Sequence, residues 1–260
     1  MRVQTSNLYK ARDLLRAWTG RNIRARYQQS ALGWLWAIVQ PVAQVAILSI
    51  IFGYFIPVDT GDFPYPVFSY VAVVPWTLLA ASLPDMNDSL VSNMGLVTKI
   101  YFPREILPVA AMLARLMDFG IAAGLLLVLM VIYRVPVSVS ALLYLPLILA
   151  IQLLLILGLG LACAALNVFF RDVRSLLVLG LQVWFYATPI LYPASMVPEQ
   201  LQTLYFLNPM AGIIVAYRDV LLSGTPPGMY LIPSALISLL IFIGGYWLFK
   251  RLEWQFADIV

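Results

Sequence analysis

The sequence predicts an all-α integral membrane protein with six transmembrane helices, and three observations lead to this fold class. Hydrophobic residues make up 62% of the 260 residues and charged residues only 11%, whereas soluble domains contain roughly 45–50% and about 25%. The apolar residues form long runs, and about 20 in a row are enough to cross a bilayer as a helix. Finally, 13 of the 16 lysines and arginines fall on one side when both termini are placed in the cytoplasm, as the positive-inside rule requires.

Short polar or proline-rich segments separate the expected spans. Residues 1–30 are expected to form a cationic, amphipathic helix on the cytoplasmic side, which Gly20 breaks or bends before Tyr27. Residues 250–260 form a basic cytoplasmic tail. The chain is therefore expected to be one transmembrane domain covering residues 1–260, with spans at 32–56, 67–90, 109–133, 141–170, 175–191 and 229–249.

Residues 192–228 are too apolar for a plain loop and too often interrupted for a span. They predict two short helices that dip into the outer face of the membrane and return. Pro198 and Pro209 each fit the first turn of a helix. Proline has no backbone N–H, and the N–H groups of the first turn have no partner within the helix, so nothing is lost there. Asn208 is placed to cap the second helix, and Gly224 is placed to end it.

Arg115 and Asp118 are charged residues inside the third expected span. At a spacing of three residues they share one helix face and can pair, which lowers the cost of placing each charge in a membrane. A structural pair that faces another helix or water is the favoured interpretation, and a proton relay is the alternative. Gly120 and Gly124 follow one turn further on and form a GxxxG sequence that suits close helix packing.

The residue types present argue against catalysis. The chain has no histidine and one cysteine, Cys163, so the commonest general base is missing and no thiolate metal cluster is expected. No GxxxxGK[ST] sequence occurs, so the chain is not expected to hold ATP in a P-loop. A membrane enzyme, such as a glycosyltransferase or lipid phosphatase, would depend on single outer-face acids: Asp59, Asp62, Glu199 and Asp219.

The net charge of +4 arises from cations beside apolar spans, which favours anionic lipids and a cytoplasmic partner over nucleic acid. Segment 99–108, KIYFPREILP, presents aromatic residues beside charges and between two prolines, as a docking element for a partner would. Its alternative is a surface loop whose exposed aromatics anchor in lipid headgroups. Other aromatic residues lie at span ends, where they form an interfacial belt or contact sugars; the candidates for a glycan path are Trp34, Trp36, Trp184 and Tyr186.

These motifs together resemble the membrane subunit of type-2 ABC exporters for polysaccharides, the permeases for O-antigen, capsule and teichoic acid. The resemblance covers nearly the whole chain. It includes KIYFPREILP, NVFFRDVR at 167–174, TPILYP at 188–193, NPMAGIIVAYRDVL at 208–221 and the C-terminal Glu253, Phe256, Ala257 and Asp258. At the start of the first span the matching residues are Arg21, Ile23, Arg26, Tyr27, Ser30, Leu32, Gly33, Trp34 and Pro41. Asn22 departs from the family, which usually has an acid there.

The resemblance implies a six-span protomer that pairs with a second copy and binds two ATPase subunits, which carry ATP and Mg²⁺, so that this chain needs no cofactor. The substrate would be a glycan linked to a lipid diphosphate, exported across the bacterial cytoplasmic membrane among its lipids. The resemblance also assigns residues to roles. An interface helix would contain Arg21, Arg24, Arg26 and Tyr27, and ATPase coupling would involve Tyr101, Phe102, Pro103, Arg104 and Glu105. Re-entrant gate helices would contain Tyr192, Asn208, Pro209 and Arg218. A drug or lipid exporter of the same architecture is the alternative.

Overall fold

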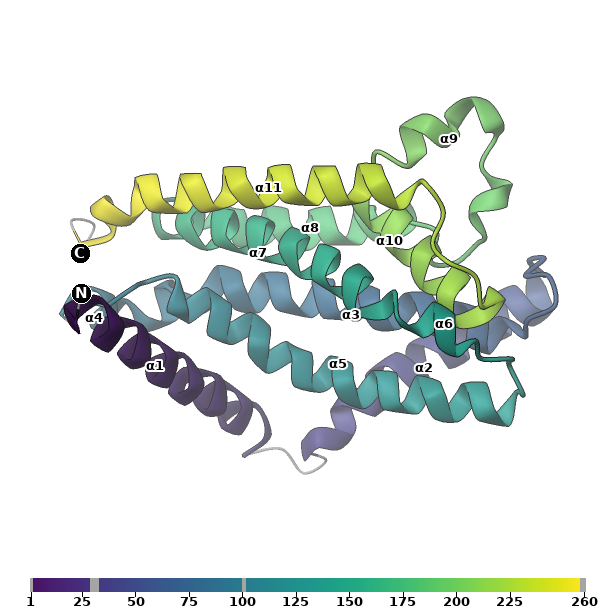
Figure 1. Cartoon of the computed structure of the whole chain (residues 1–260), viewed down its shortest axis with the longest axis horizontal. Coiled ribbons are helices and arrows are strands. Elements are labelled where there is room, and N and C mark those ends of the chain that lie inside the picture. Colours follow the sequence, from purple (N-terminus) through teal and green to yellow (C-terminus); the bar gives the residue numbers. More distant parts are fainter. Residues whose placement is uncertain (1, 29–32, 100–101, 258–260) are drawn as a thin grey trace.

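Figure 1 shows the computed structural model of the chain, which describes residues 2–28, 33–99 and 102–257. These residues form helices and connecting turns, and none of them lies in a β-strand. Five helical segments are long and apolar enough to cross a membrane. They are Gly33–Phe55, Tyr65–Ser89, Ile106–Ile132, Val139–Phe169 and Leu231–Phe256.

The five segments contain the main helices of the bundle. The first combines η1 (Gly33–Leu35), α2 (Trp36–Ile50) and a π-helical end, η2 (Ile51–Phe55). The second and third are α3 (Tyr65–Ser89) and α5 (Ile106–Ile132). The fourth joins α6 (Val139–Leu142) to α7 (Leu145–Phe169), and the fifth is α11 (Leu231–Leu252) with the 3-10 turn η6 (Glu253–Ala257).

The segment expected as a span at 175–191 is helix α8 (Asp172–Tyr186), which has 15 residues and is not among the five long segments. At about 1.5 Å per residue it is roughly 22 Å long, against the ~30 Å thickness of a bilayer core. Thr188, Pro189 and Pro193 follow it in a non-helical turn. The helix therefore ends earlier than its apolar composition suggests.

One further long helix and several short elements make up the rest of the described residues. Helix α1 (Arg2–Tyr27) runs without a break through Gly20, so the expected interruption there is wrong. The remaining elements are η3 (Val91–Asn93), α4 (Met94–Val97), η4 (Ala194–Met196), α9 (Glu199–Tyr205), α10 (Pro209–Arg218) and η5 (Asp219–Ser223).

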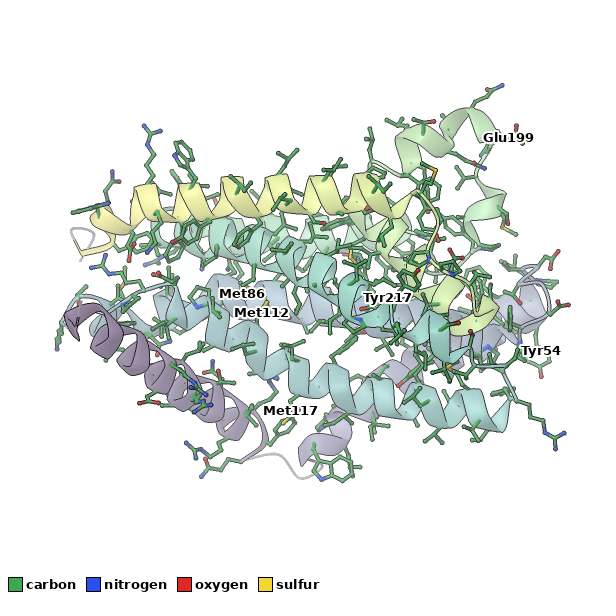
Figure 2. All side chains as sticks on the ribbon, in the orientation of Figure 1. Tyr54, Met86, Met112, Met117, Glu199 and Tyr217 are labelled. Atoms are coloured by element: carbon green, nitrogen blue, oxygen red, sulfur yellow. The ribbon has the colours of Figure 1, made fainter. Side chains whose placement is uncertain are left out.

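The long helices run roughly along the longest axis of the molecule, and α1 lies obliquely beside α5 (Figure 1). Helix α3 is the most buried of the five segments and packs against α2, α5, α7, α8 and α10. The start of α1, helix α4 and the end of α11 lie at one end of the bundle, which we call the terminal end. Figure 2 places Tyr54 and Glu199 at the opposite end, which we call the distal end.

A buried polar chain links three helices in the middle of the bundle. The Tyr217 hydroxyl on α10 donates to the Gln152 side-chain oxygen on α7 at 3.1 Å, and the Gln152 amide donates to the Pro75 carbonyl of α3 at 2.7 Å (Tyr217 is labelled in Figure 2). Because neither side chain has access to solvent, each hydrogen bond offsets a desolvation cost. These two hydrogen bonds fix α10 against α3 and α7.

The closest helix crossing joins α7 to α11. A Cβ atom on Gly158 would lie 2.6 Å from the backbone of Ile241, and one on Gly245 would lie 2.0 Å from the Gly158 carbonyl oxygen. Only glycine permits this approach. A Cβ atom on Gly120 or Gly124, in contrast, would meet no atom of another element within 4 Å, so the described residues show no close helix packing at GxxxG.

Candidate functional site

A charge cluster joins three helices where the C-terminal end of α1 meets α3 and α5 (Figure 1). It consists of Arg26 on α1, Asp85 on α3, and Arg115 and Asp118 on α5. Arg26 donates to Asp85 at 2.7 Å and to Asp118 at 2.6 Å. Arg115 donates to Asp85 at 2.6 Å and to Asp118 at 3.2 Å. Each guanidinium therefore bridges two carboxylates, and the four formal charges cancel.

The cluster is partly shielded from solvent, with side-chain exposures of 18–30%. The expected pair of Arg115 and Asp118 is confirmed. The Tyr27 hydroxyl also donates to Asp118, and burial raises the pKa of Tyr27 to about 12, so the phenol keeps its proton at neutral pH. The cluster is thus a latch that holds the C-terminal end of α1 against α3 and α5.

Two further residues of α1 differ in their surroundings. The Arg21 guanidinium donates to the Asn93 side chain at 3.2 Å and lies 4.3 Å from the centre of the Trp18 ring. Arg24 is exposed and has no side-chain partner among the described residues. Of the four expected interface-helix residues, the structure therefore brings Arg26 and Tyr27 into the latch and leaves Arg24 outside it.

The expected coupling segment, 101–105, lies at the terminal end of the bundle, and Tyr101 is outside the described residues. Phe102 is half-buried against a small core that includes Leu90, Phe249 and Phe256. The expectation that Phe102 is exposed is therefore wrong, because Phe102 packs against a core to which the ends of the chain's helices contribute. Pro103, its neighbour, is exposed.

The two charges of this segment contact the end of α11. Arg104 donates to the Glu253 carbonyl oxygen and lies 5.8 Å from the centre of the Phe256 ring. Both carboxylate oxygens of Glu105 accept from the Lys250 ammonium at 2.9 Å, and Glu253 accepts from the same group. Glu105, which the resemblance assigns to ATPase coupling, is thus paired within the chain.

A second polar site lies near the distal end, where the expected gate residues meet. Asn208 caps α10 by accepting from the Met210 N–H, and Pro209 occupies the first helical position. The same Asn208 oxygen accepts from the Trp184 indole at 2.8 Å, and its amide donates to Thr188 at 3.0 Å. The predicted cap is confirmed, and it also binds the turn that follows α8.

Arg218, expected on the outer face, is buried at the C-terminal end of α10. Its guanidinium donates to the carbonyl oxygens of Pro189 at 2.6 Å, Ile190 at 3.0 Å and Tyr192 at 3.3 Å, and lies 3.6 Å from the centre of the Phe68 ring. Burial lowers the pKa of Arg218 to about 9, so the group remains charged at neutral pH. Carbonyl dipoles and an aromatic face thus stabilise this cation, and they fix the turn 188–193 to α10.

The gate region also contains a pair of phenols. The Tyr205 hydroxyl on α9 donates to the Tyr192 hydroxyl at 3.1 Å, and burial raises the pKa of Tyr205. Gly224 follows η5 with φ of +64°, so it ends this helix as expected. Pro198 precedes α9 as its cap, one position earlier than expected.

The four aromatic residues expected along a glycan path have different environments. Trp34, Trp36 and Tyr186 are 56%, 44% and 62% exposed. Trp184 is partly buried, because it packs edge-on against Trp76 and is bonded to Asn208. Trp184 therefore supports the α8 turn, whereas the other three are free to contact a ligand.

The acids on which a membrane enzyme would depend, Asp59, Asp62, Glu199 and Asp219, lie in the loop after η2 or in short helices. No group of three His, Cys, Asp or Glu residues suited to a metal ion occurs within the described parts of the chain. Asp59 accepts from the Gly61 backbone N–H at 2.9 Å in a loop turn, and Glu199 lies in the first turn of α9. Asp219 is partly buried, which raises its pKa to about 6.

The fold and these sites define a multi-pass helical membrane protein with a latched N-terminal helix and short helices inserted before its last span. The chain belongs to the ABC-2 type transporter family, whose model matches residues 13–222. It is 30% identical over 248 residues to the O-antigen export system permease protein RfbA of Klebsiella pneumoniae, covering 95% of both chains. The RfbA protein of Myxococcus xanthus is 28% identical over 257 residues, or 97% of each chain. The polysialic acid transport protein KpsM of Escherichia coli is 26% identical over 238 residues, covering 90% of this chain.

Proposed function

We propose that this chain is the permease subunit of an ATP-driven exporter that moves a lipid-linked polysaccharide, most simply an O-antigen-type glycan, across the bacterial cytoplasmic membrane. The observation that carries the proposal is end-to-end similarity to O-antigen export permeases, over 95% of the chain. The similarity to a polysialic acid transport protein favours capsule export as the second candidate. In both cases the chain transports and does not catalyse.

The proposed assembly contains two copies of this chain and two ATPase subunits that bind ATP and Mg²⁺. Family membership supports a partnership with an ABC ATPase. In this assembly the ATPase would dock at the terminal end, where Pro103 is exposed beside the half-buried Phe102. Because Glu105 and Arg104 are tied to the end of α11, force applied at this segment would reach α5 and α11 together.

The proposed topology has six spans, with α8 as the fifth, and both termini in the cytoplasm. It rests on the distribution of lysine and arginine and on the shared position of the start of α1 and the end of α11 (Figure 1). Helices α9 and α10 would then be re-entrant elements on the outer face. Reporter fusions test this arrangement: those after Asp59, Arg134 and Glu199 should report outside, and those after Lys99, Arg171 and Val260 inside. A fusion after Glu199 that reports inside would remove the gate assignment.

Export itself is tested by deleting the chain in a cell that makes the polysaccharide. The lipid-linked glycan should accumulate inside and disappear from the surface, and the wild-type gene should restore export. The purified chain should hydrolyse ATP only after the ATPase subunit is added. Normal surface glycan in the deletion strain would refute the proposed function.

A further inference from the structure

Two glutamines and a threonine inside the membrane segments have side chains without partners. Gln40 and Gln44 lie on α2, and Thr77 lies on α3. None of the three makes a hydrogen bond through its side chain to another residue that the structure describes. Gln40 and Gln44 are four residues apart and therefore share one helix face. Unpaired amides at this depth are unfavourable against lipid, so an intramembrane polar group of this kind indicates contact with water or a ligand.

These side chains line two neighbouring hollows between α2 and α3. One has a volume of about 260 Å³ and includes Trp36, Gln40 and Thr77. The other has a volume of about 310 Å³ and includes Gln40, Gln44, Trp76 and Thr77. Gln40 and Thr77 line both hollows, so the two adjoin and are taken together as one groove. We call it the amide groove and define it by these five residues.

The charge cluster borders the hollow of about 260 Å³, which Arg26, Arg115 and Asp118 also line. Both arginines already bridge two aspartates each, at 2.6–3.2 Å. A phosphate or diphosphate would have to displace those carboxylates or lie beside them. The groove therefore offers no free cation for an anionic headgroup, and its remaining polar groups are neutral.

The chemistry of the groove fits hydroxyl groups. A carboxamide both donates and accepts hydrogen bonds, as a hydroxyl does, and Thr77 adds a further donor and acceptor. The indole of Trp36, 44% exposed, supplies an apolar ring with a polar N–H edge, whereas Trp76 is buried in the wall of the groove. A lipid acyl chain in the groove would leave both amides unpaired, whereas a sugar ring satisfies them and covers the aromatic surface.

We propose that the amide groove binds neutral, hydroxyl-rich sugar units of the glycan during its passage, with Gln40, Gln44 and Thr77 as hydrogen-bonding residues. The inference rests on the proposed function and names the part of the permease that contacts the polymer. It also adds polar residues to the candidate glycan path, for which the sequence predicts aromatic residues alone. A second copy of the chain, with glutamines hydrogen-bonded across two α2 helices, is the competing occupant.

The first test uses the complete permease–ATPase complex in cells that make a lipid-linked polysaccharide of neutral sugars labelled with a radioactive monosaccharide. The double variant Gln40→Leu/Gln44→Leu removes two neutral hydrogen-bonding groups and should lower the rate of export roughly ten-fold. Gln40→Asn/Gln44→Asn, which keeps the amides, should recover part of that loss. Val42→Leu, on an exposed position of α2 outside both hollows, is the matched control and should export like wild type.

Membrane levels and co-purification of the ATPase should be unchanged in the leucine variant, which separates loss of substrate contact from loss of folding. If the wild-type complex exports no glycan, the proposed function fails. If it exports and the leucine variant equals it, the groove is not part of the path and the inference is overturned while the proposed function stands.

Photo-crosslinking identifies the occupant directly. A benzophenone amino acid at position 40 should label the radioactive glycan during export, and the same probe at position 42 should label lipid or protein. Labelling of a second copy of the chain from position 40, without glycan, would assign the groove to the dimer contact and overturn the inference.

Discussion

Removing the Arg26 side-chain charge should release the C-terminal part of α1 from the bundle. In Arg26→Gln, Asp85 and Asp118 lose bonds of 2.7 and 2.6 Å, and one arginine remains for two aspartates. Breaking a buried ion pair costs about 3–5 kcal/mol, and breaking an exposed one about 0.2–1 kcal/mol. With Arg26 21% exposed, we expect about 2 kcal/mol, which corresponds to a roughly thirty-fold larger population of detached α1.

Hydrogen–deuterium exchange of the backbone amides in residues 12–28 measures this population in lipid nanodiscs. Once detached, α1 loses its packing on α5 and frays, so exchange should accelerate in proportion to the detached fraction. Arg24→Gln is the matched control, since Arg24 is exposed on the same helix and has no side-chain partner among the described residues.

A double-mutant cycle then separates the ion pair from other effects of the substitution. Arg26→Gln/Asp118→Asn leaves Arg115 paired with Asp85 and restores neutrality. Its effect should be smaller than the sum of the single effects by about 1 kcal/mol or more, because the two residues are in contact. Equal exchange rates in Arg26→Gln and Arg24→Gln would show that the cluster does not hold α1.

Three other substitutions have outcomes that thermal unfolding in detergent can measure. Glu105→Lys places two cations together and should cost about 1 kcal/mol, and adding Lys250→Glu should restore stability; no restoration would mean that this pair does not form within the chain. Arg218→Met leaves three carbonyl oxygens unpaired and should cost about 3 kcal/mol, whereas Arg171→Met, at an exposed arginine, should have little effect; equal losses would refute the carbonyl clamp. Because the pKa of Asp219 rises from 3.8 to about 6 on folding, its contribution to stability is complete below about pH 4 and is lost as the pH rises through about 6. Asp219→Asn should therefore melt above wild type at about pH 7.5 and with wild type at about pH 4, and equal melting at both pH values would refute the burial of this carboxyl.

Features encoded by neighbouring residues were predictable from the sequence. Hydropathy located five long membrane segments, and the Asn208 cap followed from the residue types around Pro209. The pair of Arg115 and Asp118 also followed from spacing on one helix. These features depend on contacts within one element or on composition alone.

Features that depend on distant parts of the chain were missed. Arg26 meets its two aspartates across 59 and 92 positions of sequence, so no spacing rule connects them. The partner of Glu105 lies 145 positions away on α11, and Phe102 packs against a core that includes the distant Phe249 and Phe256. The aromatic and charged residues of segment 99–108 suggested an exposed docking element. In the structure, however, Phe102 packs against a core of this chain, and Arg104 and Glu105 bond to residues near its C-terminal end.

The glycine crossing between α7 and α11 has a mechanical consequence for a transporter. Because a Cβ atom on Gly245 would lie 2.0 Å from the Gly158 carbonyl oxygen, any side chain at this position would force the two helices apart, and their close packing depends on glycine. We call this packed pair of helices the post. The tie from Glu105 to Lys250 attaches one end of α5 to this post. A displacement applied at Glu105 would therefore move α5 and the post together relative to α2, which lines the amide groove.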